Sequence, residues 1–166
     1  MAVSRADGTR RPRASHALSV LAALAVLSVV RVSALAGLIG MVGLLALGYG
    51  LVQQSEPPVV FAGGALFGAT VLAATGPAAA ESVLVGAFGA VIAADLGTFA
   101  LGIDRDADAG VATTRVELFH AVGSVTVAIV TAGVGYVLFE TVPSGDSLGV
   151  VALLLGGVVL VWLLRE

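Results

Sequence analysis

Four side chains in two neighbouring apolar runs are of types that can do chemistry inside a membrane. Asp95 lies in one run, and Glu117, His120 and Ser124 lie in the next. A carboxylate and an imidazole can share a proton or pass it on, and a hydroxyl beside them can extend the hydrogen-bond chain. The same groups can equally form a buried polar link between two helices.

The depths of Asp95 and His120 along their runs predict that the two side chains meet. Asp95 lies eight residues before Ile103, which is about 12 Å from the inner end of its run at helical rise. His120 lies roughly 9 Å into the next run, and Ser124 follows one turn later on the same face. A carboxylate in mid-span costs roughly 2.5–3.5 kcal/mol, so it needs a partner. We therefore expect an intramembrane polar pair of Asp95 and His120, joined by Ser124, which holds two helices together in preference to conducting protons or ions.

The start of the second run has a structural explanation. Thr114 and Glu117 match a capping box, in which each side chain bonds a free backbone N–H at the beginning of a helix. Glu117 also suits the positive end of the helix dipole, and Arg115 suits the inner headgroup boundary. Thr114, Arg115 and Glu117 are thus expected to cap and position a helix rather than to react.

Composition places these residues in a membrane protein. The chain has 166 residues, of which 58% are hydrophobic and 11% charged, whereas a soluble domain carries about 25% charged residues. The absence of Cys excludes disulfides, thiolate metal sites and thiol nucleophiles. All eight basic residues are Arg and the net charge is −3, which gives no basic surface for nucleic acid.

Six apolar runs divide the chain. If the first two were one helix from Ala14 to Val52, it would reach roughly 58 Å across a hydrocarbon core of ~30 Å, so a turn at Arg31 fits better. The expected fold class is all-α, an integral membrane bundle of six transmembrane helices, with five as the alternative if the first two runs are one segment. The runs are approximately Ala14–Val30, Val32–Val52, Val59–Thr75, Ser82–Ile103, Arg115–Phe139 and Leu148–Leu164.

Charge predicts the topology. Residues 1–13 are expected to form a disordered, Arg-rich cytoplasmic arm ahead of a single six-helix transmembrane domain over residues 14–166. With both termini cytoplasmic, every Arg except Arg31 lies inside, as the positive-inside rule requires, and the location is the cell (plasma) membrane. Arg10 and Arg11 before an apolar run also match a twin-arginine signal, but Pro12 and Arg13 follow where an apolar residue is preferred.

No sequence motif predicts catalysis or a bound metal. Asp104, Asp106 and Asp108 begin like a calcium loop, but Ala109 stands where that loop needs Gly, and Arg115 where it needs Glu. Phosphate-binding, zinc-protease, esterase and dinucleotide motifs are absent from the sequence. We therefore expect no catalytic residue, no metal ligand and no cofactor.

Small residues predict close helix packing. Gly64 and Gly68 form a G-x-x-x-G pattern, and Gly86 with Ala90 forms a similar pair. Such residues let the backbones of two helices approach closely in lipid.

The segment from Asp95 to Ser124 contains a distinctive set of residues, namely Asp95-Leu96-Gly97, Ala100, Ala112-Thr113-Thr114-Arg115, Glu117-Leu118, His120-Ala121 and Gly123-Ser124. Over this segment the chain resembles a family of small multi-pass membrane proteins of halophilic archaea, which has no established activity. Members are often encoded near MoxR-type ATPases and transglutaminase-like membrane proteins, so the resemblance implies an accessory role in such a system and assigns no catalytic residue. The acidic stretch Asp104–Gly110 departs from the family's commoner loop.

Two functions follow as hypotheses. The leading one is a non-enzymatic multi-pass membrane protein that serves as a scaffold or accessory subunit of a membrane complex. The alternative is a small transporter or channel subunit with a proton or ion relay at Asp95 and His120. The expected partners are the lipid bilayer and other membrane proteins.

Overall fold

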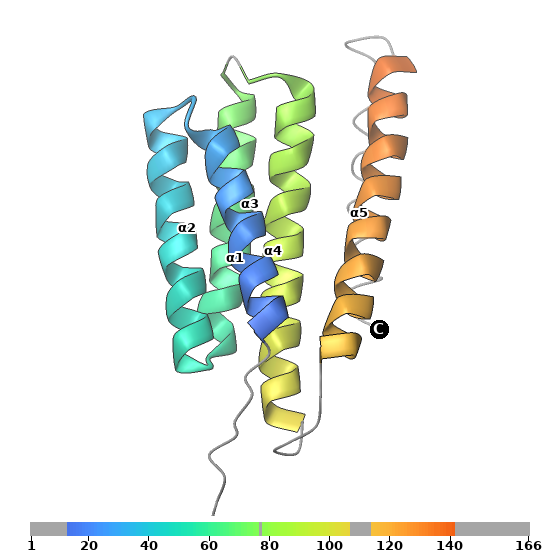
Figure 1. The fold of residues 1–166 in the computed structure, drawn as a ribbon. Helices are drawn as coiled ribbons and strands as arrows, with labels where there is room; N and C mark the ends of the chain where they lie inside the picture. The colour runs from blue at the N-terminus through green and yellow to red at the C-terminus, as the bar shows by residue number, and fades with distance from the viewer. Residues whose placement is uncertain (1–12, 77, 107–113, 142–166) are drawn as a thin grey trace, which may run out of the picture. The chain divides into compact units, whose positions relative to one another are not determined.

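The computed structural model describes residues 13–76, 78–106 and 114–141, and these residues form helices joined by turns, with no strand among them. The helices are α1 (Arg13–Val30), α2 (Ala34–Gln53), α3 (Glu56–Ala74), α4 (Ala80–Asp106) and α5 (Thr114–Thr141). The first four run alternately up and down, as Figure 1 shows. The all-α expectation is thereby confirmed.

The predicted number of six helices is not matched, because five helices occupy the described part of the chain. The sixth predicted run, Leu148–Leu164, and most of the predicted arm, residues 1–12, lie outside the described residues. The first two runs are separate helices, α1 and α2, joined at Arg31–Ser33, so the merged alternative is wrong. Within the described residues, four helices, α2 to α5, are long and apolar enough to cross a membrane, and the apolar stretch of α1 (Ala14–Val30) is shorter.

Local residue chemistry fixes where the helices begin and end. Ser33 precedes α2, and its hydroxyl accepts a hydrogen bond from the backbone N–H of Ala36. Gln54 ends α2 in the left-handed conformation, with φ of 53°. Pro57 and Pro58 stand in the first turn of α3, where a helix needs no backbone N–H from them.

Small side chains make the core. α2 packs against α3, α1 against α4, and α3 against α4. A Cβ added to Gly63 of α3 would lie 2.6 Å from Cβ of Ala94, and one on Gly97 of α4 would lie 2.8 Å from Val59. These two helices therefore approach so closely that even an alanine methyl group needs a shift of the neighbouring helix.

The two predicted small-residue pairs have different environments. A Cβ on Gly86 would lie 2.8 Å from Thr70 of α3, and Ala90 is fully buried, so this pair lines the contact of α3 with α4. A Cβ on Gly64 or Gly68 would meet nothing within 4 Å in the described structure. The G-x-x-x-G pattern of α3 therefore makes no helix contact there.

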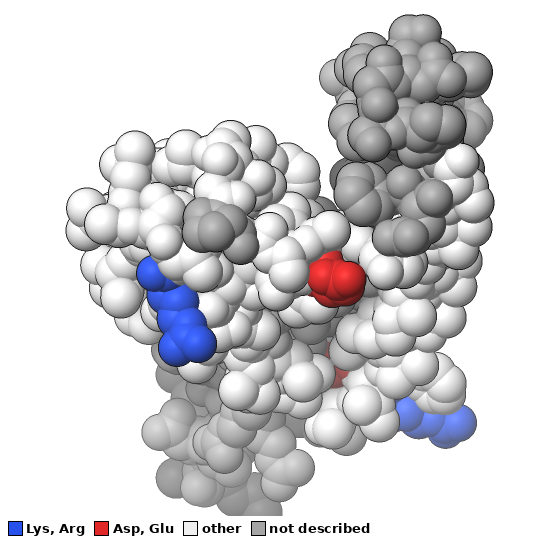
Figure 2. Space-filling model, turned by 90° about the horizontal axis from the view of Figure 1, so that it is seen from above, with Lys and Arg blue, Asp and Glu red and all other residues white. Residues whose placement is uncertain are grey.

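The outer surface of the described helices is mostly apolar. Seen from above in Figure 2, the described surface is mostly uncharged, with isolated acidic and basic groups. Large side chains such as Leu38, Leu45 and Phe61 are more than half exposed. A surface of this kind is compatible with lipid contact and supports a membrane protein.

The chain divides inside α5 into two compact units, Met1–Ala128 and Ile129–Glu166. The first unit contains α1 to α4 and the first turns of α5. In the second, the described residues continue α5 as far as Thr141, whose hydroxyl donates to the carbonyl oxygen of Val137 at 2.8 Å. All the predicted site residues belong to the first unit.

Candidate functional site: a polar junction between α4, α5 and α1

A carboxylate oxygen of Asp95 joins α4 to α5. Nε2 of His120 lies 2.9 Å from Oδ2 of Asp95, and the hydroxyl of Ser124 donates to the same oxygen at 2.5 Å. The structure thus brings Asp95 and His120, the expected pair, together with Ser124 on neighbouring helices. One carboxylate oxygen links both α5 side chains.

Helical spacing explains why these contacts form as a set. His120 and Ser124 are four residues apart, so both side chains lie on the same face of α5. On α4, Phe99 follows Asp95 by the same interval, and its ring stacks on the His120 imidazole with centroids 3.7 Å apart and planes 10° apart. His120 therefore meets α4 through a hydrogen bond at its edge and an aromatic contact on its face.

The Asp95–His120 pair is partly accessible. The side chains are 34% and 32% exposed, respectively, so each presents about a third of its surface outside the junction. The backbone carbonyl of Asp95 accepts a further hydrogen bond from the Thr98 hydroxyl at 3.0 Å. An interhelical hydrogen bond in a membrane contributes about 0.6 kcal/mol on average and up to ~1.7 kcal/mol, so the junction stabilises the α4–α5 contact modestly.

Glu117 makes a second attachment, to α1. The side chain is only 2% exposed, and its Oε2 accepts hydrogen bonds from the backbone N–H of Ser15 at 2.9 Å and from the Ser15 hydroxyl at 3.1 Å. Ser15 lies in the first turn of α1, where backbone N–H groups have no partner within the helix. Glu117 therefore caps the start of another helix.

The expected capping box of Thr114 and Glu117 stays a prediction beside this contact. Thr114 is the first residue of α5 and is exposed. Sequence reasoning missed Ser15, although a serine at the start of an apolar run was a signal that this N-terminus needs an acceptor. The local pattern in α5 already accounts for an acidic residue at position 117, so it gives no sign of a partner on α1.

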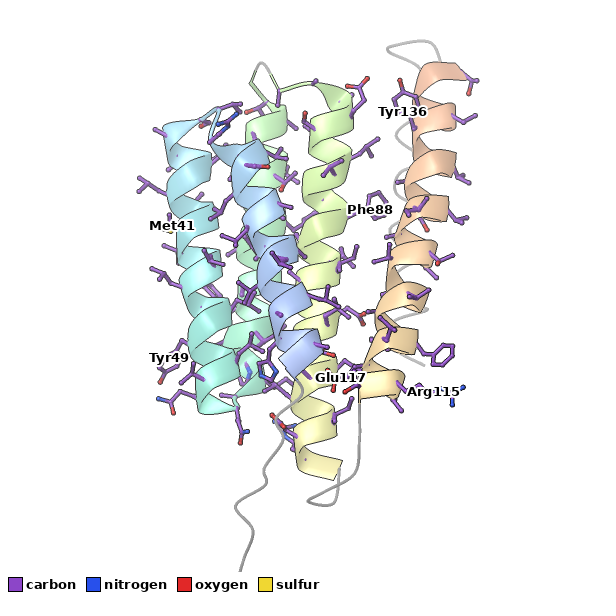
Figure 3. The ribbon with its side chains drawn as sticks, in the orientation of Figure 1. Met41, Tyr49, Phe88, Arg115, Glu117 and Tyr136 are labelled. Carbon is purple, nitrogen blue, oxygen red and sulfur yellow. The ribbon has the colours of Figure 1, made fainter. Side chains whose placement is uncertain are left out.

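Arg115 points away from the junction. Figure 3 shows Glu117 directed from α5 toward the lower end of α1 and Arg115 directed to the other side. The guanidinium carbon of Arg115 lies 5.6 Å from the centre of the Phe119 ring, a cation–π arrangement. Arg115 thus lies on an outward face, which suits the predicted headgroup boundary.

Two exposed contacts place the α2–α3 turn at the same end of the bundle as the C-terminal end of α4. The Gln54 side chain donates to Asp104 at 3.2 Å, and Arg105 donates to Glu56 at 3.3 Å. The Arg105 and Glu56 side chains are 55% and 52% exposed, so this ion pair contributes about 0–1 kcal/mol. The ion pair shows instead that the α2–α3 turn and the C-terminal end of α4 lie together, and both are predicted to face the cytoplasm.

The polar junction reaches only part of the way along the helices. From Glu117 to Ser124 the α5 axis advances about 10 Å. On α4, the residues between Glu81 and Asp95 include no ionisable side chain, a stretch of about 21 Å. In the described part of the chain, moreover, no group of three or more His, Cys, Asp or Glu could hold a metal ion.

Comparison with known proteins gives a family and no activity. A family model described as a family of unknown function, DUF7519, matches residues 9–162. The chain belongs to this family. No curated protein and no solved structure matches the chain. The matched region of this DUF7519 member includes all the described helices.

Proposed function

We propose that the protein is a non-enzymatic multi-pass membrane protein that serves as a scaffold or accessory subunit of a membrane complex. One observation supports this proposal above the others: the polar side chains of the junction are used to join helices. Asp95 links α4 to α5, and Glu117 links α5 to α1. Polar groups that join helices to one another fit a structural role, in which the protein acts as a scaffold and does not react with a substrate.

The setting we propose is the cell membrane of a halophilic source, with both termini in the cytoplasm. The chain forms one transmembrane domain over residues 14–166 behind an Arg-rich arm. The clustering of the Gln54–Asp104 and Arg105–Glu56 contacts at one end supports this topology, because the rule for basic residues assigns that end to the cytoplasm. The resemblance over Asp95 to Ser124 supports the source and a partner in a MoxR-type or transglutaminase-like system.

Co-purification from native membranes tests the scaffold proposal. The tagged full-length protein is isolated from its own membranes in mild detergent, beside a variant in which Asp95 and Glu117 are both Ala. We expect a membrane protein to co-purify in a fixed ratio with the wild type and to be lost with the variant. The proposal is contradicted if the wild-type protein is isolated without a partner and the double variant is as abundant in the membrane as the wild type.

The second candidate is a proton or ion relay at Asp95 and His120. The observation that favours it is the continuous hydrogen-bond chain from Ser124 through Asp95 to His120. Proton and sodium flux into proteoliposomes tests it with the wild type, Asp95→Asn, His120→Ala and the control Thr126→Ala. Thr126 bonds the carbonyl of Val122 in its own helix and lies outside the junction. Flux that Asp95→Asn abolishes while folding persists establishes the relay and rejects the scaffold.

A further inference from the structure

We propose that α5 is a separable helix, held at its first three turns by two polar attachments to a core of α1 to α4. The first attachment is Glu117 on Ser15 of α1, and the second is His120 with Ser124 on Asp95 of α4. When both attachments open, α5 leaves the core at this end, and α1 to α4 stay packed. This conformational device is independent of whether the protein is a scaffold or a relay.

The apolar surface of α5 adds little to its hold on the core. In the first unit, the buried apolar side chains of α5 are Ala121 and Ala128, which are among the smallest. The large ones face outward, with Val116, Leu118, Phe119, Val122 and Val127 all more than half exposed. The polar groups therefore carry a large share of the contact.

Backbone approach separates α5 from the other helices as well. In the core, a Cβ on Gly63 or Gly97 would come within 3 Å of another helix. Among the described helices, α2 packs closely with α3, α1 with α4 and α3 with α4, and α5 makes no comparably packed pair. The core is thus closely packed, whereas the first turns of α5 are joined to it mainly through polar side chains.

Interhelical hydrogen bonds in a membrane are individually weak, so the two attachments can open, and α5 then takes a second arrangement. Both attachments lie at one end of α5, within seven residues of each other. Their opening uncovers the Asp95 carboxylate and the start of α1 and requires no change in the α2–α3 or α3–α4 contacts. The consequence is a helix that can dock and undock while the rest of the bundle holds its shape.

Distance measurements between spin labels test this directly, and the Cys-free sequence allows clean labelling. One labelled pair joins Leu45 of α2 to Val122 of α5, and a reference pair joins Leu45 to Val85 of α4; all three positions are more than half exposed. Each pair is measured in the full-length protein in lipid nanodiscs. The backgrounds are wild type, the double variant Glu117→Ala with Asp95→Ala, and the control Thr126→Ala.

We expect the double variant to broaden and shift the α2–α5 distances beyond the wild-type distribution, with the α2–α4 distances unchanged. The control should match the wild type for both pairs. Unchanged distances in the double variant show that apolar contact alone holds α5, which overturns the proposal. Simultaneous change of both pairs shows that α5 and the core form one cooperative unit, which overturns it equally.

Discussion

Nε2 of His120 lies 2.9 Å from Oδ2 of Asp95, across 25 positions of sequence and between two helices. The same oxygen accepts the Ser124 hydroxyl, so Asp95 serves two side chains on one face of α5. Phe99 holds the imidazole plane from α4. These contacts join α4 to α5, and their contribution to the free energy of unfolding can be measured.

Adjacent glycines in α3 should differ sharply in their tolerance of alanine. Gly63→Ala places a methyl group 2.6 Å from Cβ of Ala94, and we expect a loss of about 1–3 kcal/mol in the free energy of unfolding. Gly64→Ala meets nothing within 4 Å and should be neutral or stabilising by about 0.5–1 kcal/mol, because alanine favours the helix. Unfolding in detergent micelles measures both. Equal losses would contradict the close approach of α3 and α4.

Glu117 should be coupled to Ser15 of α1. Loss of a helix cap costs roughly 0.5–2 kcal/mol, and Ser15→Ala removes the hydroxyl, one of the two donors to Glu117. We expect a double-mutant cycle of Ser15→Ala with Glu117→Ala to show coupling, whereas Ser28→Ala, whose hydroxyl bonds its own helix, should show none. The parallel cycle with Thr114→Ala measures the capping box. Coupling to Thr114 alone would mean that the attachment to α1 is unimportant.

The exposed ion pair of Arg105 with Glu56 should contribute little to stability. We expect Glu56→Gln to change the free energy of unfolding by about 0–1 kcal/mol, because both side chains are more than half exposed. The difference should shrink further at high salt, where surface charges are screened. Unfolding at two salt concentrations checks this. A salt-independent loss of several kcal/mol would show that the pair is buried in the membrane-embedded protein.

Labelling of single cysteines should place the helix turns on opposite sides of the membrane. We expect Gln54→Cys and Arg105→Cys to react with an impermeant reagent from the cytoplasmic side, since their side chains bond partners at one end of the bundle. Arg31→Cys, in the turn between α1 and α2, should react from the other side only. Reaction of residue 31 from the cytoplasm would overturn the proposed topology.

The sequence predicted the helices of the described chain well, because long apolar runs separated by Arg31, by Pro57–Pro58 and by acidic turns leave few other folds in lipid. It could not tell which glycines face another helix. Gly64 and Gly68 matched the packing pattern but face outward, whereas the tight contact is made by Gly63. One position along a helix turns a side chain by about 100°, and hydropathy alone does not fix that rotation in an all-apolar run.

For the site, depth along antiparallel helices was enough to predict that Asp95 and His120 would be neighbours, and the structure has them in contact. The attachment of Glu117 to Ser15 was not foreseen, because these residues are 102 positions apart. Predicting it requires knowing that the start of α1 lies next to the start of α5. That arrangement arises from packing of the whole first unit and leaves no trace in the local pattern around either residue.

A double-mutant cycle on Asp95 and His120 tests most directly whether this pair holds α4 and α5 together. The free energy of unfolding is measured for the wild type, Asp95→Asn, His120→Ala and the double variant, with Thr126→Ala as the control. We expect each single variant to be destabilised and the pair to show a coupling of about 0.6 kcal/mol, up to ~1.7 kcal/mol. Strictly additive losses, or single variants as stable as the wild type, would contradict the role of the pair in joining the two helices.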